Sequence, residues 1–295
     1  MRGLLGLVIY RWGRRSQDRL LVECLGPLAA ELWRSGEVDR FWFDRYDARG
    51  PHLFAVFGAA QDHLDRLTGR LGAALDGYLA ASPSLETLTA ERLERIHLQA
   101  RGRRQCEVDG RPGFGANDSW EIFAHPPRGY PFGLAGRVQD EDEVWRLAAG
   151  LALRMIERIA VRTEPPGLAE AVHWTAAVDR ALRAAGADPA AYWRHHAATL
   201  VSPEDGSPLD DFLVDALPDA LEPRHLENLG RLWAEAERDG GSWPELPRLV
   251  RAALAGEGWT LLRELDHAAL KQQGVPVALH LPAVLFAWRR SRLSR

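Results

Sequence analysis

The stretch RFWFDRYDARGPHLFAVF, residues 40–57, predicts a β-hairpin. Its two arms, 40–46 and 52–57, are rich in aromatic and β-branched residues, which favour strands. Between the arms, Gly50 and Pro51 mark a turn. Two adjacent strands joined in this way pair antiparallel, so the hairpin gives the first part of a sheet.

The sequence on either side of the hairpin extends this sheet region. Residues 4–10 are apolar and predict a strand, and 17–34 place leucines at helical spacing. Ser16 is the expected N-cap of that helix, and Ser35-Gly36 provides the glycine expected just past its end. A second helix is predicted over 61–79. The resulting order, β-α-β-β-α, predicts an α+β fold with a ferredoxin-like antiparallel sheet.

The C-terminal half has a different pattern. From Glu141 onward nearly all of the sequence has helical periodicity, with breaks at proline-rich segments. The predicted helices cover 141–161, 167–185, 189–199, 224–238, 244–254, 259–271 and 276–291. We therefore expect a mixed α+β region over 1–140, with a peptide-binding sheet edge, and a helical region over 141–295, the two packing as one compact unit.

Composition excludes several classes of protein. The formal net charge is -4, so a nucleic acid is not an expected partner. Cys24 and Cys106 are too few and too far apart for a disulfide framework or a structural zinc site, which is typical of a cytoplasmic protein. The apolar start of the chain is too short to span a bilayer, so no membrane association is expected. The oligomeric state, monomer or homodimer, is left open.

Few residues stand out as a self-contained catalytic or ligand site. The sequence contains no GxGxxG, GxxxxGK[ST], HExxH or GxSxG motif, and we expect no cofactor and no metal. Adjacent residues on a helix point about 100° apart, so His195 and His196 do not easily share a metal ion. The basic run Arg101, Arg103 and Arg104 has two interpretations, an exposed loop or a site for acidic residues of a peptide.

The segment that carries a specific signal is FWFDRYDARGPHL, residues 41–53, which follows a helix containing DRLL at 18–21 and LGPL at 25–28. It resembles the start of the C-terminal elimination domain of lantibiotic dehydratases, a family also found as standalone proteins in thiopeptide biosynthesis. In that family a strand and helix with D-x-L-L and P-L lead into an aromatic strand, F-x-R-Y, and then G-P-H-L. The resemblance covers about 55 residues.

The resemblance implies an enzyme that modifies a ribosomally made precursor peptide, with two known activities. One removes glutamate from glutamylated Ser or Thr to give dehydroalanine or dehydrobutyrine. The other, in thiopeptide pyridine synthases, joins two dehydroalanines in a formal [4+2] cycloaddition and then loses water and the leader peptide. Expected partners are the precursor peptide, leader and core, and other maturation enzymes. A third possibility is a peptide-binding partner without catalytic activity.

The sequence departs from the eliminating members at two places. Where they have arginines just after P-H-x, in an R-L-R run, LFAVF at 53–57 of this chain has none, and WEIFAHPPRGY at 120–130 replaces their R-Y-G-G segment. Only His280 matches their histidine near the end. Without those arginines a departing carboxylate loses its partners, which favours the pyridine-forming cyclase over the eliminase.

The cycloaddition requires two alkenes held in register while an amide tautomerises, with donors or acceptors nearby. Arg45 and His52 of the hairpin, together with the terminal His280, also have structural alternatives, such as an ion pair between Arg45 and Asp44 or Asp47. Arg101, Arg103 and Arg104 are the expected leader-peptide contacts. The expected catalytic residues are Arg45, His52, Glu121, His125, Arg128, Tyr130, His280 and Arg289.

Overall fold

The computed structural model divides the chain into two compact units, Met1–Gly133 with Ala148–Arg162 (unit 1), and Leu134–Leu147 with Thr163–Arg295 (unit 2). The expected packing of the two halves as one compact unit stays a prediction. The structure describes residues 2–47, 49–102, 113–123, 139–163, 166–201, 216–239, 243–256, 258, 262, 269–270, 272–273 and 279–293.

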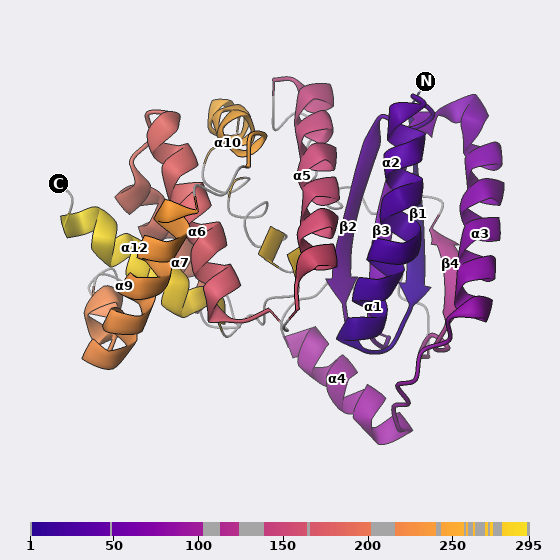
Figure 1. Cartoon of the computed structure of the whole chain (residues 1–295), viewed down its shortest axis with the longest axis horizontal. Coiled ribbons are helices and arrows are strands. Elements are labelled where there is room, and N and C mark those ends of the chain that lie inside the picture. Colours follow the sequence, from indigo (N-terminus) through magenta and orange to yellow (C-terminus); the bar gives the residue numbers. More distant parts are fainter. Residues whose placement is uncertain are drawn as a thin grey trace. The chain divides into compact units, whose positions relative to one another are not determined.

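Unit 1 is built on a four-stranded antiparallel sheet with the order β2-β3-β1-β4 (Figure 1). The predicted hairpin is present, with Tyr46 opposite His52 beside the turn. The strand order places the first strand between β3 and the later β4, which is the ferredoxin-like arrangement. The strands are β1 Arg2–Tyr10, β2 Arg40–Tyr46, β3 His52–Ala60 and β4 Ser119–Phe123.

The helical stretch after β1 is longer than predicted and is interrupted. It consists of α1 Arg14–Leu20, a π-helical turn Leu21–Leu25 and α2 Gly26–Arg34. Pro27 explains the interruption, because a proline inside a helix has no N–H to donate and its ring crowds the preceding turn. The predicted N-cap was wrong, since Gly13 and not Ser16 precedes the first turn. The glycine expected past the other end, Gly36, has the left-handed φ of 74°.

Two further helices complete the described part of unit 1 before β4. A short 3-10 turn, Gln61–His63, leads into α3 Leu64–Ala81, close to the predicted bounds. Helix α4, Ala90–Gly102, was not predicted. Its first turns bury Leu93 while Leu98 is 60% exposed, so its apolar face is too narrow for a clear helical pattern.

The two faces of the sheet have different surroundings. Side chains alternate between faces along a strand, and directly paired residues share a face. Arg45, Ile9 and Trp120 point to the face covered by helices, because Arg45 contacts Gln17 of α1 and Trp120 packs against Gly72 of α3. Tyr10, Tyr46, His52 and Glu121 point to the opposite face.

The helices that follow match the predictions within a few residues where the structure describes them. In unit 2, α6 and α7 both pack against α12, and α9 and α10 pack against α6. Most of the predicted helix 259–271 and the first residues of 276–291 lie outside the described residues. The observed helices are α5 Glu141–Val161, whose residues divide between the two units, α6 Leu168–Ala184, α7 Pro189–Val201, α9 Pro223–Arg238, α10 Leu246–Ala255 and α12 His280–Leu293.

The predicted fold class is confirmed. The chain is α+β, with one small antiparallel sheet near its start and helices through the rest of the described chain. No helix in the described ranges is long and apolar enough to cross a membrane.

The burial of Cys24, in the π-helical turn, can be tested directly. Burial raises the pKa of its thiol from 9.0 to about 11, so at pH 8 the thiolate fraction falls about 100-fold. We expect iodoacetamide to label Cys24 about 100-fold more slowly in the native protein than in urea, measured in a Cys106→Ser background. The folded state binds the extra proton, so stability should fall as pH rises from 9 through about 11. Equal labelling rates would contradict the packing.

Candidate functional site

A group of polar and aromatic side chains in the described part of unit 1 lies on the sheet face opposite the helices, next to the hairpin turn. We call it the hairpin cluster. Its residues come from β1, β2, the turn, β3 and β4. They are Tyr10, Tyr46, Arg49, His52 and Glu121.

His52 lies at the centre of this cluster and is fully buried. Its ring stacks on Tyr46 at 5.7 Å and lies 5.3 Å from the ring of Tyr10. Its Nδ1 is 2.8 Å from the carbonyl oxygen of Gly50. If that nitrogen carries the proton, it donates to the carbonyl, which orients the imidazole. His52 is therefore held between two tyrosines by the turn itself.

Glu121 joins the cluster from β4. Its Oε1 accepts hydrogen bonds from the hydroxyl of Tyr10 at 2.8 Å and from Nη1 of Arg49 at 3.0 Å. The guanidinium of Arg49 also lies 5.6 Å from the centre of the Tyr10 ring, in cation–π contact. A histidine, a carboxylate, a cation and two phenols are thus gathered in one place, with groups able to accept and donate protons.

Two of the expected catalytic residues, His52 and Glu121, are brought together here. The sequence analysis missed Tyr10, Tyr46 and Arg49. Tyr46 had a usable signal, because it flanks the turn opposite His52 and must share its face. Tyr10 and Arg49 had none, since their contact with Glu121 depends on how β1 pairs with β3 and β4.

Arg45 lies on the other face, among helices. Its Nη1 donates to Gln17 Oε1 at 3.0 Å and its Nη2 to Asp18 Oδ1 at 2.5 Å. Asp18 also accepts from Arg162 at 2.8 Å. Burial lowers the pKa of Arg45 to about 10, and the Asp18 carboxylate opposes that effect. An ion pair was foreseen as an alternative for Arg45, and the structure shows one with Asp18, while Asp44 accepts from the backbone N–H of Arg45.

The remaining expected residues are placed as follows. His280 is fully buried at the start of α12, in unit 2. Arg289 of the same helix donates to Asp219 Oδ1 at 2.9 Å and to the carbonyl of Pro218, in a 3-10 turn. Arg101 lies in the last turn of α4, and its side chain is outside the described part of the structure. The residues outside the described part of the chain are His125, Arg128, Tyr130, Arg103 and Arg104.

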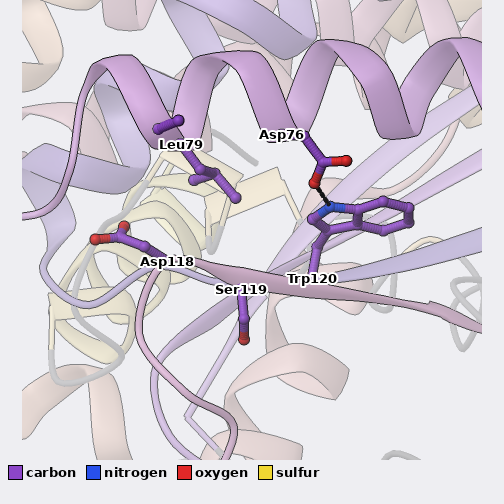
Figure 2. Close-up of a pocket in the computed structure, with 6 residues that line it drawn as sticks. Asp76, Leu79, Asp118, Ser119 and Trp120 are labelled. Atoms are coloured by element: carbon purple, nitrogen blue, oxygen red, sulfur yellow. Dashed lines mark hydrogen bonds between the residues drawn. The ribbon is translucent and has the colours of Figure 1, made fainter.

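A groove of about 440 Å³ runs between the C-terminal half of α3 and the start of β4. Figure 2 shows Asp76 and Leu79 facing Trp120, with the indole Nε1 donating to Asp76 Oδ1 at 2.7 Å. Asp118, at the other end, is paired with the buried Arg11. Strand β4 lies at the edge of the described sheet, and Ile122 on it is 38% exposed.

Metal ligation has no support in the described part of the chain, which contains no group of three or more His, Cys, Asp or Glu arranged to hold an ion. His196 is buried against the rings of Tyr192 and Trp193 in α7.

The family model for the lantibiotic biosynthesis dehydratase C-terminal region matches residues 7–255, most of the chain and well beyond the hairpin. The chain belongs to this family. No curated protein matches it by sequence. The match spans the whole hairpin cluster, as well as Asp18 and Arg45.

Solved structures of two proteins are similar to this one. The pyridine synthase TbtD, from thiomuracin biosynthesis, is 18% identical with a TM-score of 0.67, over 99% of this chain and 98% of its own. The tRNA-dependent lantibiotic dehydratase MibB from Microbispora sp. 107891 is 16% identical with a TM-score of 0.48, over 99% of this chain and 28% of its own. The likeness to TbtD shows that the fold is shared from end to end.

Proposed function

We propose that this protein is a pyridine-forming macrocyclase of thiopeptide-type biosynthesis. It joins two dehydroalanines of a ribosomally made precursor in a formal [4+2] cycloaddition, with loss of water and of the leader peptide. The proposal rests on family membership, on the shared fold with a pyridine synthase, and on one decisive feature of β3.

That feature is the absence of guanidinium groups along β3, where eliminating members are expected to have arginines. Phe54, Ala55 and Val56 fill these positions and are buried. A departing glutamate needs cations that bind its carboxylates, and a buried apolar strand provides none. A cycloaddition develops little charge, so an aromatic site that holds two alkenes in register suits it better.

The hairpin cluster is the proposed reaction site. Glu121, whose side chain is 27% exposed, offers a proton acceptor to a bound peptide, and the buried rings of Tyr10, Tyr46 and His52 form the packed wall beside it. Arg45, His125, Arg128, Tyr130, His280 and Arg289 remain proposed contributors. For the leader peptide we propose strand addition at the β4 edge, beside the groove of Asp76 and Trp120, with Arg101, Arg103 and Arg104 as contacts for its acidic residues.

A glutamate eliminase is the second candidate, and one observation favours it. Arg49 places a guanidinium on the same sheet face as His52. To hold a substrate glutamate, however, Arg49 would have to release Glu121, to which it donates at 3.0 Å. The competing carboxylate within the protein makes this the weaker proposal.

The experiment is mass spectrometry of the precursor encoded near this gene, prepared once with dehydroalanines in place and once with glutamylated serines. We expect the first substrate to lose leader peptide and water, giving a pyridine product. Loss of glutamate from the second alone would establish the eliminase instead. No change in either, with leader binding retained in fluorescence anisotropy, would establish a non-catalytic peptide-binding partner.

A further inference from the structure

The carboxylate of Glu121 is oriented by two donors from different elements. Tyr10 of β1 and Arg49 of the hairpin turn both donate to the same oxygen, Oε1. Among the three side chains, Glu121 is the most accessible, at 27% exposed against 12% for Arg49, while Tyr10 is buried. Glu121 is therefore the member that a bound substrate reaches first.

Arg49 is itself held in place by contacts on several sides. It has a φ of 60°, which is uncommon for a residue with a side chain. Its backbone N–H donates to His97 of α4, its carbonyl accepts from Gly115, and its Nε donates to the carbonyl of Gly113. Strained residues of this kind persist where the surrounding contacts determine them and are frequent at functional sites.

We propose that Glu121 is the proton carrier of the cycloaddition, with Tyr10 and Arg49 as positioning residues. The inference rests on the proposed function and adds to it the group that forms the iminol. The amide N–H bond of the substrate breaks as its proton moves to the Glu121 carboxylate, the C–N double bond forms, and the C=O double bond becomes a single bond with its electron pair on the oxygen. Glu121 then gives that proton to the former carbonyl oxygen, so the carboxylate is regenerated and no proton or electron is consumed.

The contacts of Tyr10 and Arg49 explain why both are needed. Two donors on one oxygen restrict rotation of the carboxylate, so its position relative to a bound amide is set before the substrate arrives. Arg49 also places a positive charge beside the Glu121 carboxylate, at 3.0 Å. Neither group has to touch the substrate to act in this way.

The test compares initial rates of pyridine formation on the dehydroalanine precursor. We expect Glu121→Gln to lower kcat at least about 100-fold with KM within about twofold. Tyr10→Phe and Arg49→Met should lower kcat about tenfold or more with KM unchanged. Arg49→Lys, which keeps the charge, should recover part of the loss.

Glu23 provides a matched control, because it also accepts from a tyrosine and an arginine, Tyr78 and Arg19. This second set is on the surface, outside the hairpin cluster. Glu23→Gln, Tyr78→Phe and Arg19→Lys should leave kcat and KM unchanged. A loss of kcat in the Glu121 set alone would then come from its place in the hairpin cluster and not from the type of hydrogen bond removed.

The inference is overturned if the wild-type protein forms pyridine and Glu121→Gln does so at the same kcat, or if the loss appears only in KM. A wild-type protein that forms no pyridine refutes the proposed function itself, which is a separate result. The unfolding temperature of every variant is measured alongside its rates, to show that the variant is folded. If Glu121→Gln does not fold, the test uses Tyr10→Phe, which removes a single hydroxyl. An unchanged kcat in that variant would refute the positioning role.

Discussion

Asp18→Ala is expected to lower the free energy of unfolding by about 3–5 kcal/mol, because it removes the carboxylate from two largely buried arginines. Arg45 and Arg162 donate to its two oxygens at 2.5 and 2.8 Å. Their side chains are only 5% and 13% exposed, so water replaces the lost partner poorly. Urea denaturation followed by circular dichroism measures the change.

The control for this prediction is Glu23→Ala, which removes an exposed carboxylate paired with Arg19. Exposed pairs contribute little, so its denaturation curve should overlie that of the wild type. The double variant Asp18→Ala/Arg45→Met should regain part of the lost stability, since it also removes the buried charge. Similar curves for Asp18→Ala and Glu23→Ala would show that Asp18 does not hold α1 to the sheet.

Gly115→Ala is expected to lower turnover in the pyridine-forming assay by at least about tenfold. A Cβ atom at Gly115 would lie 2.2 Å from ring atoms of Tyr10. That ring is confined between His52 and the guanidinium of Arg49, so it cannot move without displacing the hairpin cluster. The overpacking should also destabilise the protein by about 1–3 kcal/mol.

Gly69→Ala is the matched control, because Gly69 is an exposed glycine of α3 with no atom within 4 Å of an added Cβ. Alanine there should stabilise the helix by roughly 0.5–1 kcal/mol and leave turnover unchanged. Full activity of Gly115→Ala, measured below its unfolding temperature, would contradict the placement of the reaction site at Tyr10.

The hairpin cluster was only partly predictable, and the reason is geometric. Arg45 and His52 were grouped because both belong to the hairpin, but adjacent positions on a strand point to opposite faces. Since Tyr46 pairs with His52, Arg45 must point the other way, towards α1. Alternation alone would have separated the two residues.

The sequence by itself determined the hairpin and the first helices. Aromatic and β-branched runs with a Gly-Pro turn predicted the hairpin, and helical periodicity predicted the α1–α2 stretch and α3 to within a few residues, because both signals are local. Tertiary structure alone decided the site. Tyr10 and Glu121 are 111 positions apart and meet only because β1 lies between β3 and β4. That register is set by burial of the sheet's two faces, which no local pattern encodes.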